Sequence, residues 1–207
     1  MARRIGLLGG SFDPVHLAHR RLADVALHEL ALDEVRWIPA GQPWQKARVL
    51  APAEHRLAMV QLATSDEPRF VVDGTELQRS GPSYTIDTVR ALQTAAGDTD
   101  PAHWYLIIGQ DQYANLPTWR DWPELLQRVT LAVACRGDAR PLAPPALIAH
   151  PHAMTVLGLP ALHVSSTELR DRLGRGGRAA DEADRTLHPA VARYIAHHQL
   201  YASGAPR

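Results

Sequence analysis

The 207-residue chain is poor in cysteine, and its single thiol, Cys135, excludes an internal disulfide. A lone cysteine within an apolar run is typical of a reducing, cytoplasmic setting. The chain also lacks an excess of charge, because 22 Lys and Arg residues are balanced by 22 Asp and Glu residues. This balance argues against a protein that holds nucleic acid by bulk electrostatics, although it is compatible with a local cationic pocket for one small anion.

Long hydrophobic runs are missing as well. No stretch approaches the roughly 20 apolar residues of a membrane-spanning helix, so no membrane partner is expected, and the N-terminal apolar run is too short for a signal peptide. The sequence has no Gly-Lys-Ser/Thr phosphate loop, and no Gly-x-Gly-x-x-Gly follows its first apolar run. These two absences argue against a P-loop NTPase and against a dinucleotide-binding oxidoreductase.

What the sequence does contain is an alternation of short apolar runs with segments of helical periodicity. Apolar runs of this kind are typical of strands buried on both faces. The pattern predicts an α/β fold, a doubly wound and mostly parallel sheet in a single domain over 1–207, whose part from about 165 to 207 is helical. We expect Ser83 to cap one helix and residues 137–153 to form a surface connection. Strands are expected at 5–8, 35–38, 70–73, 104–108, 130–135, 154–157 and 162–164.

The N-terminal segment has the strongest chemical pattern. Its apolar run ends at Gly9 and Gly10, and a helical pattern begins near His16. Glycines allow the backbone to approach a phosphate, and a helix N-terminus supplies N–H groups and a positive dipole end. His16 and His19 are three residues apart and therefore share one face of a helix. A strand, a glycine turn and such a helix together predict a nucleotide-binding unit.

Two other interpretations of the histidine pair are open. A metal site would need a third ligand, and none stands at a recognisable spacing. Packing at a helix start would be favoured if the histidines stood alone. Because they follow the double glycine and a Phe-Asp-Pro sequence, we predict that both rings donate hydrogen bonds to phosphate oxygens.

A second segment, Ser165-Ser166-Thr167 with Arg170, also predicts an anion site. Alone it would be an ordinary capping box, because Ser-x-x-Glu commonly begins a helix. It follows an apolar run, however, and it offers hydroxyls, backbone N–H groups and a guanidinium within one helical turn. Two candidate phosphate sites from opposite ends of the chain indicate a shared nucleotide ligand.

Both segments resemble signatures of the nucleotidyltransferase superfamily. The first matches a small residue, Phe-Asp-Pro and His-x-Gly-His, with Ala18 in place of the usual glycine, and the second matches Ser-Ser-Thr-x-x-Arg, which binds the outer phosphates of ATP in that superfamily. The resemblance implies a Rossmann-like nucleotidyltransferase fold. The ATP-binding residues that it implies are Gly9, Gly10, Ser11, Phe12, His16, His19, Gly109, Asp111, Ser165, Ser166, Thr167 and Arg170.

Three further segments, 81–88, 109–111 and 118–121, resemble one branch of the superfamily, the nicotinate-nucleotide adenylyltransferases. In that branch, backbone N–H groups near the equivalents of Thr85 and Arg120 receive a pyridine carboxylate, and an aromatic residue at the position of Trp119 stacks on the ring. A flat ring suits an aromatic face, and a carboxylate suits paired donors. Hydrophobic packing under a loop is the alternative for Trp119 and Trp122. The mononucleotide-binding residues that the resemblance implies are Lys46, Tyr84, Thr85, Trp119 and Arg120.

Lys46 is a special case, because the branch commonly has Pro-Pro-His-Lys where this chain has Pro43-Trp-Gln-Lys46. The lysine aligns and the histidine does not. A solvated surface lysine is the alternative, and the resemblance implies a phosphate contact.

The implied activity is transfer of the adenylyl group of ATP to nicotinate mononucleotide, which yields deamido-NAD and pyrophosphate in NAD biosynthesis. The implied catalytic residues are His16, His19, Lys46 and Arg170, with Mg²⁺ on the ATP phosphates and mostly without protein ligands. Phosphopantetheine adenylyltransferase shares the first signature but lacks the Pro-Ser-Tyr-Thr segment. A non-catalytic nucleotide sensor is another alternative. The sequence leaves open the choice between acid and amide mononucleotides and whether the chain forms a homo-oligomer.

Overall fold

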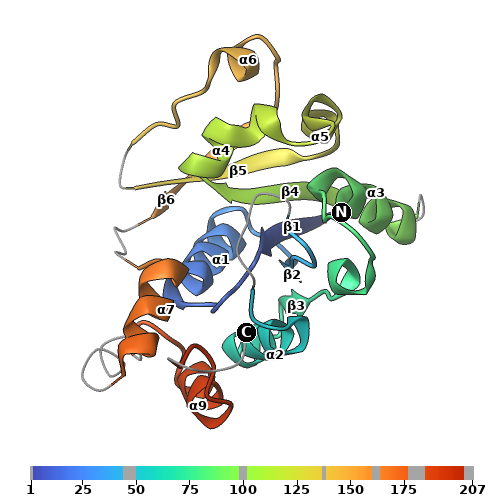
Figure 1. Cartoon of the computed structure of the whole chain (residues 1–207). Helices are drawn as coiled ribbons and strands as arrows, with labels where there is room; N and C mark the ends of the chain where they lie inside the picture. Colours follow the sequence, from blue (N-terminus) through green and yellow to red (C-terminus); the bar gives the residue numbers. More distant parts are fainter. Residues whose placement is uncertain are drawn as a thin grey trace.

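The computed structural model describes residues 2–43, 50–97, 102–136, 139–159, 164–176 and 185–202. They form a sheet in the order β3-β2-β1-β4-β5-β6, in which every neighbouring pair is parallel (Figure 1). The predicted doubly wound parallel sheet is thereby confirmed. Its strands are β1 (Arg3–Gly10), β2 (Glu34–Pro39), β3 (Phe70–Val72), β4 (Ala102–Gly109), β5 (Thr130–Arg136) and β6 (Met154–Leu159).

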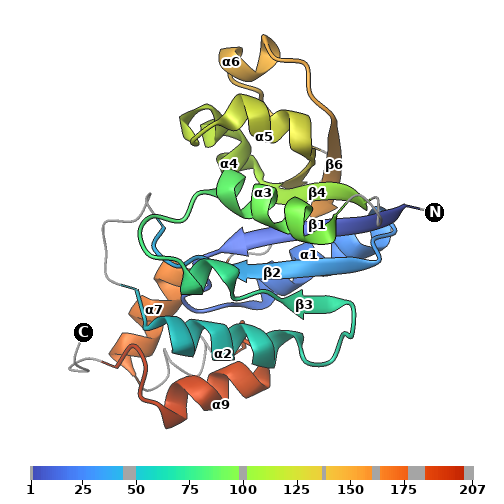
Figure 2. The ribbon, with the colours of Figure 1, turned by 90° about the vertical axis from the view of Figure 1, so that its right-hand side faces the viewer.

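Helices cover both faces of the sheet, as Figures 1 and 2 show. Alternate residues of β1 bury their side chains on opposite faces, so that Leu8 joins one apolar cluster and Leu7 the other. Removal of both faces from water is the main force that holds the layers together. One face carries α1 (Leu17–Glu29), α2 (Ala53–Thr64), α7 (Ser166–Arg175) and α9 (Pro189–His197), and the other carries α3 (Thr85–Ala96), α4 (Gln110–Asn115) and α5 (Trp122–Arg128).

Short helices complete the described chain: the 3₁₀ turns η1 (Thr75–Gln78) and η2 (Leu116–Thr118), and α6 (Pro145–Ile148). The predicted surface connection over 137–153 is therefore partly wrong, because α6 lies within it and Leu147 is only 1 % exposed. Leu147 packs in the cluster beneath α4 and α5. The expected strand at 162–164 lies mostly outside the described residues. No helix in the described ranges is long and apolar enough to cross a membrane.

The predicted caps have different outcomes. Ser165 caps α7 as expected, because its Oγ accepts a hydrogen bond from the Glu168 N–H at 3.2 Å. The prediction for Ser83 is wrong, since Tyr84 is the N-cap of α3. The Ser83 hydroxyl instead accepts from the N–H groups of Gly41 and Gln42, at 3.1 and 3.2 Å. The local sequence favours Ser83 as the N-cap of α3. In the folded chain, however, its hydroxyl is already hydrogen-bonded to the loop after β2.

A buried arginine on α2 ties together the loops that follow β1 and β2. The Arg56 side chain is 2 % exposed. Its Nη1 donates to the carbonyl oxygens of Ser11 and Ala40, at 3.1 and 2.6 Å, and its Nη2 donates to Gly41 O at 3.3 Å. Its Nε donates to Ala51 O at 3.0 Å. A buried charge of this kind is tolerated because its donors find acceptors, and it fixes the carboxyl end of the sheet.

Replacement of this arginine, Arg56→Met, should lower the free energy of unfolding by about 3 kcal/mol, because several partly buried carbonyls lose their donor. For a chain of this size the midpoint of thermal unfolding should fall by about 6 to 12 °C. Arg21→Met on the exposed side of α1 is the matched control and should change stability by less than about 0.5 kcal/mol. Equal unfolding midpoints for the two variants would contradict this role of Arg56.

Candidate functional site

A cavity of about 380 Å³ opens at the carboxyl ends of β1 and β4. Strand order reverses between these two strands, because β2 and β3 lie beyond β1 while β5 and β6 lie beyond β4. Ligands of open α/β sheets bind at such a reversal. The structure brings many of the predicted residues to this one cavity: Gly9, Gly10, Ser11, His19, Thr85, Gly109, Trp119 and Ser166 line it.

The glycines at the cavity have different physical roles. A Cβ on Gly10 would lie 2.9 Å from the ring of Phe12, so the ring needs a glycine beneath it. A Cβ on Gly9 or Gly109 would meet no heavy atom of the described chain within 4 Å. Packing within the described chain therefore does not demand glycine at these two strand ends. The space that they leave is available to a ligand that approaches the backbone.

The two histidines form a stacked pair at the start of α1. His16 is the N-cap residue, its ring centroid lies 3.7 Å from that of His19, and the planes differ by 26°. The predicted shared face is confirmed. The backbone N–H of His16 donates to Nδ1 of His19 at 3.2 Å. Because Nδ1 accepts, the proton of a neutral His19 ring resides on Nε2, which makes Nε2–H the donor for an anion.

His16 is more deeply buried than its partner. Burial lowers the pKa of the His16 ring to about 4, so the ring is neutral near pH 7. Its Nδ1 is shielded from solvent and finds no hydrogen-bond partner among the described residues. At neutral pH the His16 ring can therefore act as a hydrogen-bonding group but not as a cation.

Phe12 lies in the core and does not line the cavity. The side chain is 1 % exposed, and its backbone is in the left-handed region, with φ of 47°. The ring meets His19 edge-on at 5.1 Å and packs against Trp37 at 5.5 Å. Phe12 was predicted to bind ATP, but its ring packs in the core and supports the His19 ring by an edge-on contact.

The second predicted segment docks directly onto the first. Ser166 Oγ donates to the carbonyl oxygen of Pro14 at 3.1 Å. Arg170 Nη1 donates to the carbonyl oxygen of Asp13 at 2.6 Å, and its Nη2 donates to Thr167 Oγ1 at 3.0 Å. The N-terminus of α7 and the loop before His16 therefore form one continuous surface. Ser166 lines the cavity, while the hydroxyls of Ser165 and Thr167 hold the helix start and the arginine.

Asp13 accepts hydrogen bonds from several separate parts of the chain. The residue is fully buried. Its Oδ1 accepts from the Tyr201 hydroxyl at 2.7 Å and from the Ala51 N–H at 3.4 Å, while its carbonyl holds Arg170. Asp13 stands within the first signature, but neither its sequence context nor that of Tyr201 or Arg56 predicts these contacts. The Phe-Asp-Pro match was the only signal that pointed towards the aspartate.

Another part of the cavity wall is built from the start of α3 and the segment after η2. Thr85 is the first residue of α3, and Thr85, Thr88 and Trp119 line the cavity. The first amide groups of a helix have no partner within the helix and carry a partial positive charge. Trp119 also packs against the apolar cluster on that face, and its indole N–H has no hydrogen-bond partner among the described residues. The ring is thus both packed and at the cavity wall.

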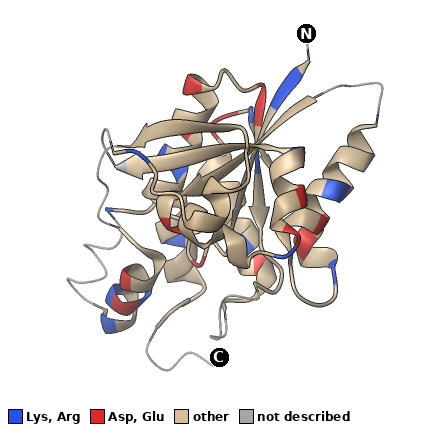
Figure 3. Ribbon diagram, turned by 90° about the horizontal axis from the view of Figure 1, so that it is seen from above, with Lys and Arg blue, Asp and Glu red and all other residues tan. Residues whose placement is uncertain are grey.

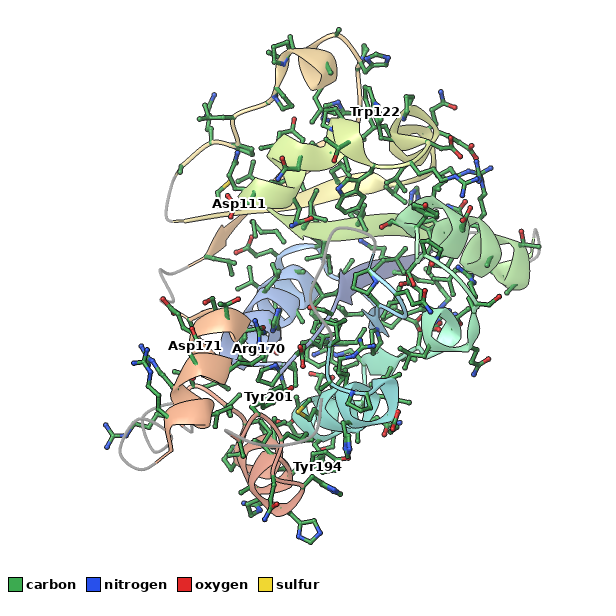
Figure 4. The ribbon with its side chains drawn as sticks, viewed as in Figure 1. Asp111, Trp122, Arg170, Asp171, Tyr194 and Tyr201 are labelled. Carbon is green, nitrogen blue, oxygen red and sulfur yellow. The ribbon has the colours of Figure 1, made fainter. Side chains whose placement is uncertain are left out.

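Tyr84 and Arg120 lie against one another beside this part of the wall. The Arg120 guanidinium sits 4.8 Å from the Tyr84 ring centroid and 4.0 Å from a carboxylate oxygen of Asp87. Asp111 is exposed on the first turn of α4, and Figure 4 shows it apart from Arg170. Lys46 lies outside the described residues, so its predicted phosphate contact stays a prediction.

Glu76 is a cavity residue that the sequence analysis missed. Its side chain is buried, and its carboxylate accepts from the Thr88 hydroxyl at 2.7 Å. Burial raises the pKa of the Glu76 carboxyl above its usual value. A single glutamate within the short turn η1 has no local pattern that could reveal this contact.

Charges of both signs are interspersed over the described part of the molecule (Figure 3). One dense group joins α3 and α5, where Arg90 contacts Asp87 and Asp121 at 3.2 Å and also pairs with Glu124. This group holds the Trp119–Asp121 segment close to the start of α3. In the described ranges the charges thus form groups of mixed sign and no extended basic face (Figure 3).

Comparisons with known proteins identify the family of the chain. Residues 7–172 match the family model described as cytidylyltransferase-like. A protein of Methylibium petroleiphilum named "Probable nicotinate-nucleotide adenylyltransferase" is 50 % identical over 97 % of this chain and 93 % of its own length. A protein of Bordetella petrii with the same name is 49 % identical over 96 % of this chain and 99 % of its own.

A solved structure supports the fold. The nicotinic acid mononucleotide adenylyltransferase of Plasmodium falciparum, solved in complex with NaAD, superposes with a TM-score of 0.79. It is 19 % identical to this chain, and the match covers 96 % of this chain and 97 % of the Plasmodium protein. The family model, the close relatives and the shared fold lead to one conclusion: the chain belongs to the nicotinate-nucleotide adenylyltransferases, within the cytidylyltransferase-like family.

Proposed function

We propose that the cavity binds ATP and nicotinate mononucleotide end to end and transfers the adenylyl group between them. The observation that carries the proposal is that the start of α7 is hydrogen-bonded to the loop before His16, beside a cavity that His19, the start of α3 and the indole of Trp119 all line. The products are deamido-NAD and pyrophosphate. The named relatives at 49 and 50 % identity support this activity.

The reaction requires no protein nucleophile. An oxygen of the mononucleotide 5′-phosphate attacks the α-phosphorus of ATP, and the bond from that phosphorus to the β-phosphate oxygen breaks. The protein has to hold two anions in line and to stabilise the charge that moves towards the leaving pyrophosphate. Both tasks can be done by donors that are fixed before the substrates arrive.

We assign these donors to the residues that the structure brings together. Nε2–H of His19 faces the α-phosphate, since Nδ1 is occupied by the His16 N–H. His16 lies beside it as a neutral ring. Arg170 and Ser166 at the start of α7 receive the leaving pyrophosphate, with the helix dipole adding to the attraction. Lys46 adds charge to the phosphates, as the resemblance implies.

Magnesium is part of the proposal as a companion of ATP. Mg²⁺ usually binds through substrate phosphates and keeps several waters, and it rarely occupies an all-protein cage. No group of three His, Cys, Asp or Glu side chains in the described ranges is arranged to hold a metal ion. The residues present therefore fit a metal that enters on the triphosphate. When bound, the ion neutralises phosphate charge, while His19 and Arg170 orient the same oxygens.

The acceptor end favours an acid over an amide. The first turn of α3 presents N–H groups with partial positive charge at a cavity that Thr85 lines. A carboxylate gains more from this field than a neutral carboxamide does. Trp119 offers the ring face for the pyridine. The Plasmodium structures, solved with NaAD and with APC, are consistent with nucleotide ligands of this kind.

We also propose a cytoplasmic location. The reaction consumes ATP, and the single thiol, Cys135, lies buried, as is usual for a protein in a reducing compartment.

The direct test is pyrophosphate release from ATP and Mg²⁺ with three acceptors in parallel: nicotinate mononucleotide, nicotinamide mononucleotide and phosphopantetheine. We expect the highest kcat/KM with the nicotinate compound. Activity with phosphopantetheine alone would overturn the assignment of the acceptor end. No pyrophosphate with any of the three would favour a nucleotide sensor.

Substitution of His19 tests the phosphate end. His19→Ala should lower kcat by about 10²- to 10³-fold, which is the usual effect of removing one donor to developing charge. His28→Ala, farther along α1 and exposed, should leave kcat unchanged. The measurement is steady-state kinetics together with thermal unfolding of both variants. Full kcat in a folded His19→Ala protein would rule out a catalytic role.

Trp119 tests the acceptor end. Trp119→Ala should raise KM for the mononucleotide by about 5- to 150-fold, since stacking of a heteroaromatic ring on an aromatic side chain contributes about 1 to 3 kcal/mol. Trp122→Ala is the matched control, because Trp122 packs against His150, outside the residues that line the cavity. A change in KM for ATP alone would place the ring pocket elsewhere.

A further inference from the structure

The loop between β1 and His16 is held by residues from the C-terminal part of the chain. Asp13 O accepts from Arg170, and Pro14 O accepts from Ser166. Asp13 Oδ1 accepts from the Tyr201 hydroxyl at 2.7 Å, and the Leu17 N–H donates to Thr186 O at 2.9 Å. Three of these partners lie on α7 or just before α9. Tyr201 differs because it follows α9 and acts through a hydroxyl on a buried carboxylate.

We infer that Tyr201 is a positioning residue for the transferase reaction: its hydroxyl holds the Asp13 carboxylate and thereby sets the place of the His16–His19 pair. The inference rests on the proposed function, because it takes the histidines as the donors to the transferred phosphate. Tyr201 itself does not line the cavity, so it acts through Asp13 and not on a substrate.

Because Asp13 is buried, loss of its hydrogen bond from the Tyr201 hydroxyl should disturb the local structure. Asp13 is 0 % exposed, and a buried carboxylate depends on its donors because water cannot replace them freely. Hydrogen bonds to ionised groups are shorter and about twice as strong as neutral ones. Loss of the Tyr201 hydroxyl would remove one of the donors to Oδ1, and the Ala51 N–H at 3.4 Å is a longer contact. The carboxylate would then shift towards other donors.

A displacement of Asp13 would move the histidines, because only a short and buried stretch of chain lies between them. Only Pro14 and Val15 separate Asp13 from His16, and both are buried. Phe12 on the other side of Asp13 supports the His19 ring edge-on. A displacement of the aspartate therefore moves residues on both sides of it that fix the histidine pair. Misplacement of a reacting group by about 1 Å can cost about 10²-fold in rate.

The position of Tyr201 depends in turn on α9. The Leu200 N–H donates to Ile195 O at 3.0 Å, which ends the helix tightly, and Ile195 is buried against the core. Figure 4 shows Tyr201 near Arg170 and α7, with Tyr194 farther away on α9. The Tyr194 hydroxyl contacts His55 Nδ1 at 2.9 Å. Tyr194 is therefore a suitable control for Tyr201, because its hydroxyl contacts His55 and not Asp13.

The test compares Tyr201→Phe with Tyr194→Phe, which remove one hydroxyl each. With ATP at saturation and nicotinate mononucleotide varied, Tyr201→Phe should lower kcat by about 5- to 50-fold, because the reacting groups are misplaced. KM for the mononucleotide should stay within about twofold, because the pyridine ring is assigned to Trp119 and not to the histidine pair. Tyr194→Phe should keep wild-type kcat. Thermal unfolding of both variants separates rate from stability. An unchanged kcat in Tyr201→Phe, or equal losses in both variants, would overturn the inference.

A second readout is independent of turnover. In ¹⁵N NMR of the histidine rings without substrates, Tyr201→Phe should shift the His16 and His19 signals, and Tyr194→Phe should shift those of His55. Unshifted His16 and His19 signals in Tyr201→Phe would reject the positioning role. If the wild-type protein released no pyrophosphate, the proposed function would fail, and the NMR result would still decide whether Tyr201 orders the histidines.

Discussion

The buried hydrogen bonds at Asp13 are the constraint on which the site depends. Its carbonyl accepts from Arg170, and its carboxylate accepts from Tyr201 and the Ala51 N–H. These partners come from α7, from the segment after α9 and from the residues before α2. Since Asp13 lies in the turn after β1, one residue brings distant parts of the chain to the end of the central strand. Through these contacts Asp13 joins the two segments that we propose to bind the phosphates.

Electrostatics at the site follow from burial more than from the number of charges. The pKa of His16 falls to about 4 because the ring is desolvated, so at neutral pH the histidine contributes a hydrogen-bonding group without a charge. Among the described residues, we assign the positive charge at the proposed phosphate site to Arg170 and to helix N-termini. Arg56 is also cationic, but its donors are directed to carbonyls of the loops after β1 and β2. The proposed binding of two anions is therefore compatible with a chain of zero net charge.

The sequence allowed prediction of the sheet and the histidine pair, because each depends on neighbours in the chain. The predicted turn at Gly9 and Gly10 is wrong, because both glycines pair with β2 as the last residues of β1, and the turn follows at Asp13 and Pro14. The apolar runs of β1 and β4 are buried on both faces, and the spacing of His16 and His19 gives the stacked rings. Ser83, Glu76 and Arg56 were misjudged or missed for one physical reason. Their partners, Gly41, Thr88 and the loop carbonyls, are brought near only by tertiary packing, and local propensity carries no information about such contacts.

The central claim is that the His16–His19 turn and the start of α7 form a single site for the phosphates of ATP. A double-mutant cycle of His19→Ala and Arg170→Ala, read as kcat/KM for ATP, tests it most directly. Residues that act on one ligand as a unit give non-additive losses, whereas independent sites give additive free energies. We predict that the double variant is at least about fivefold more active than the product of the single losses implies. A loss equal to that product would show that the two segments act separately.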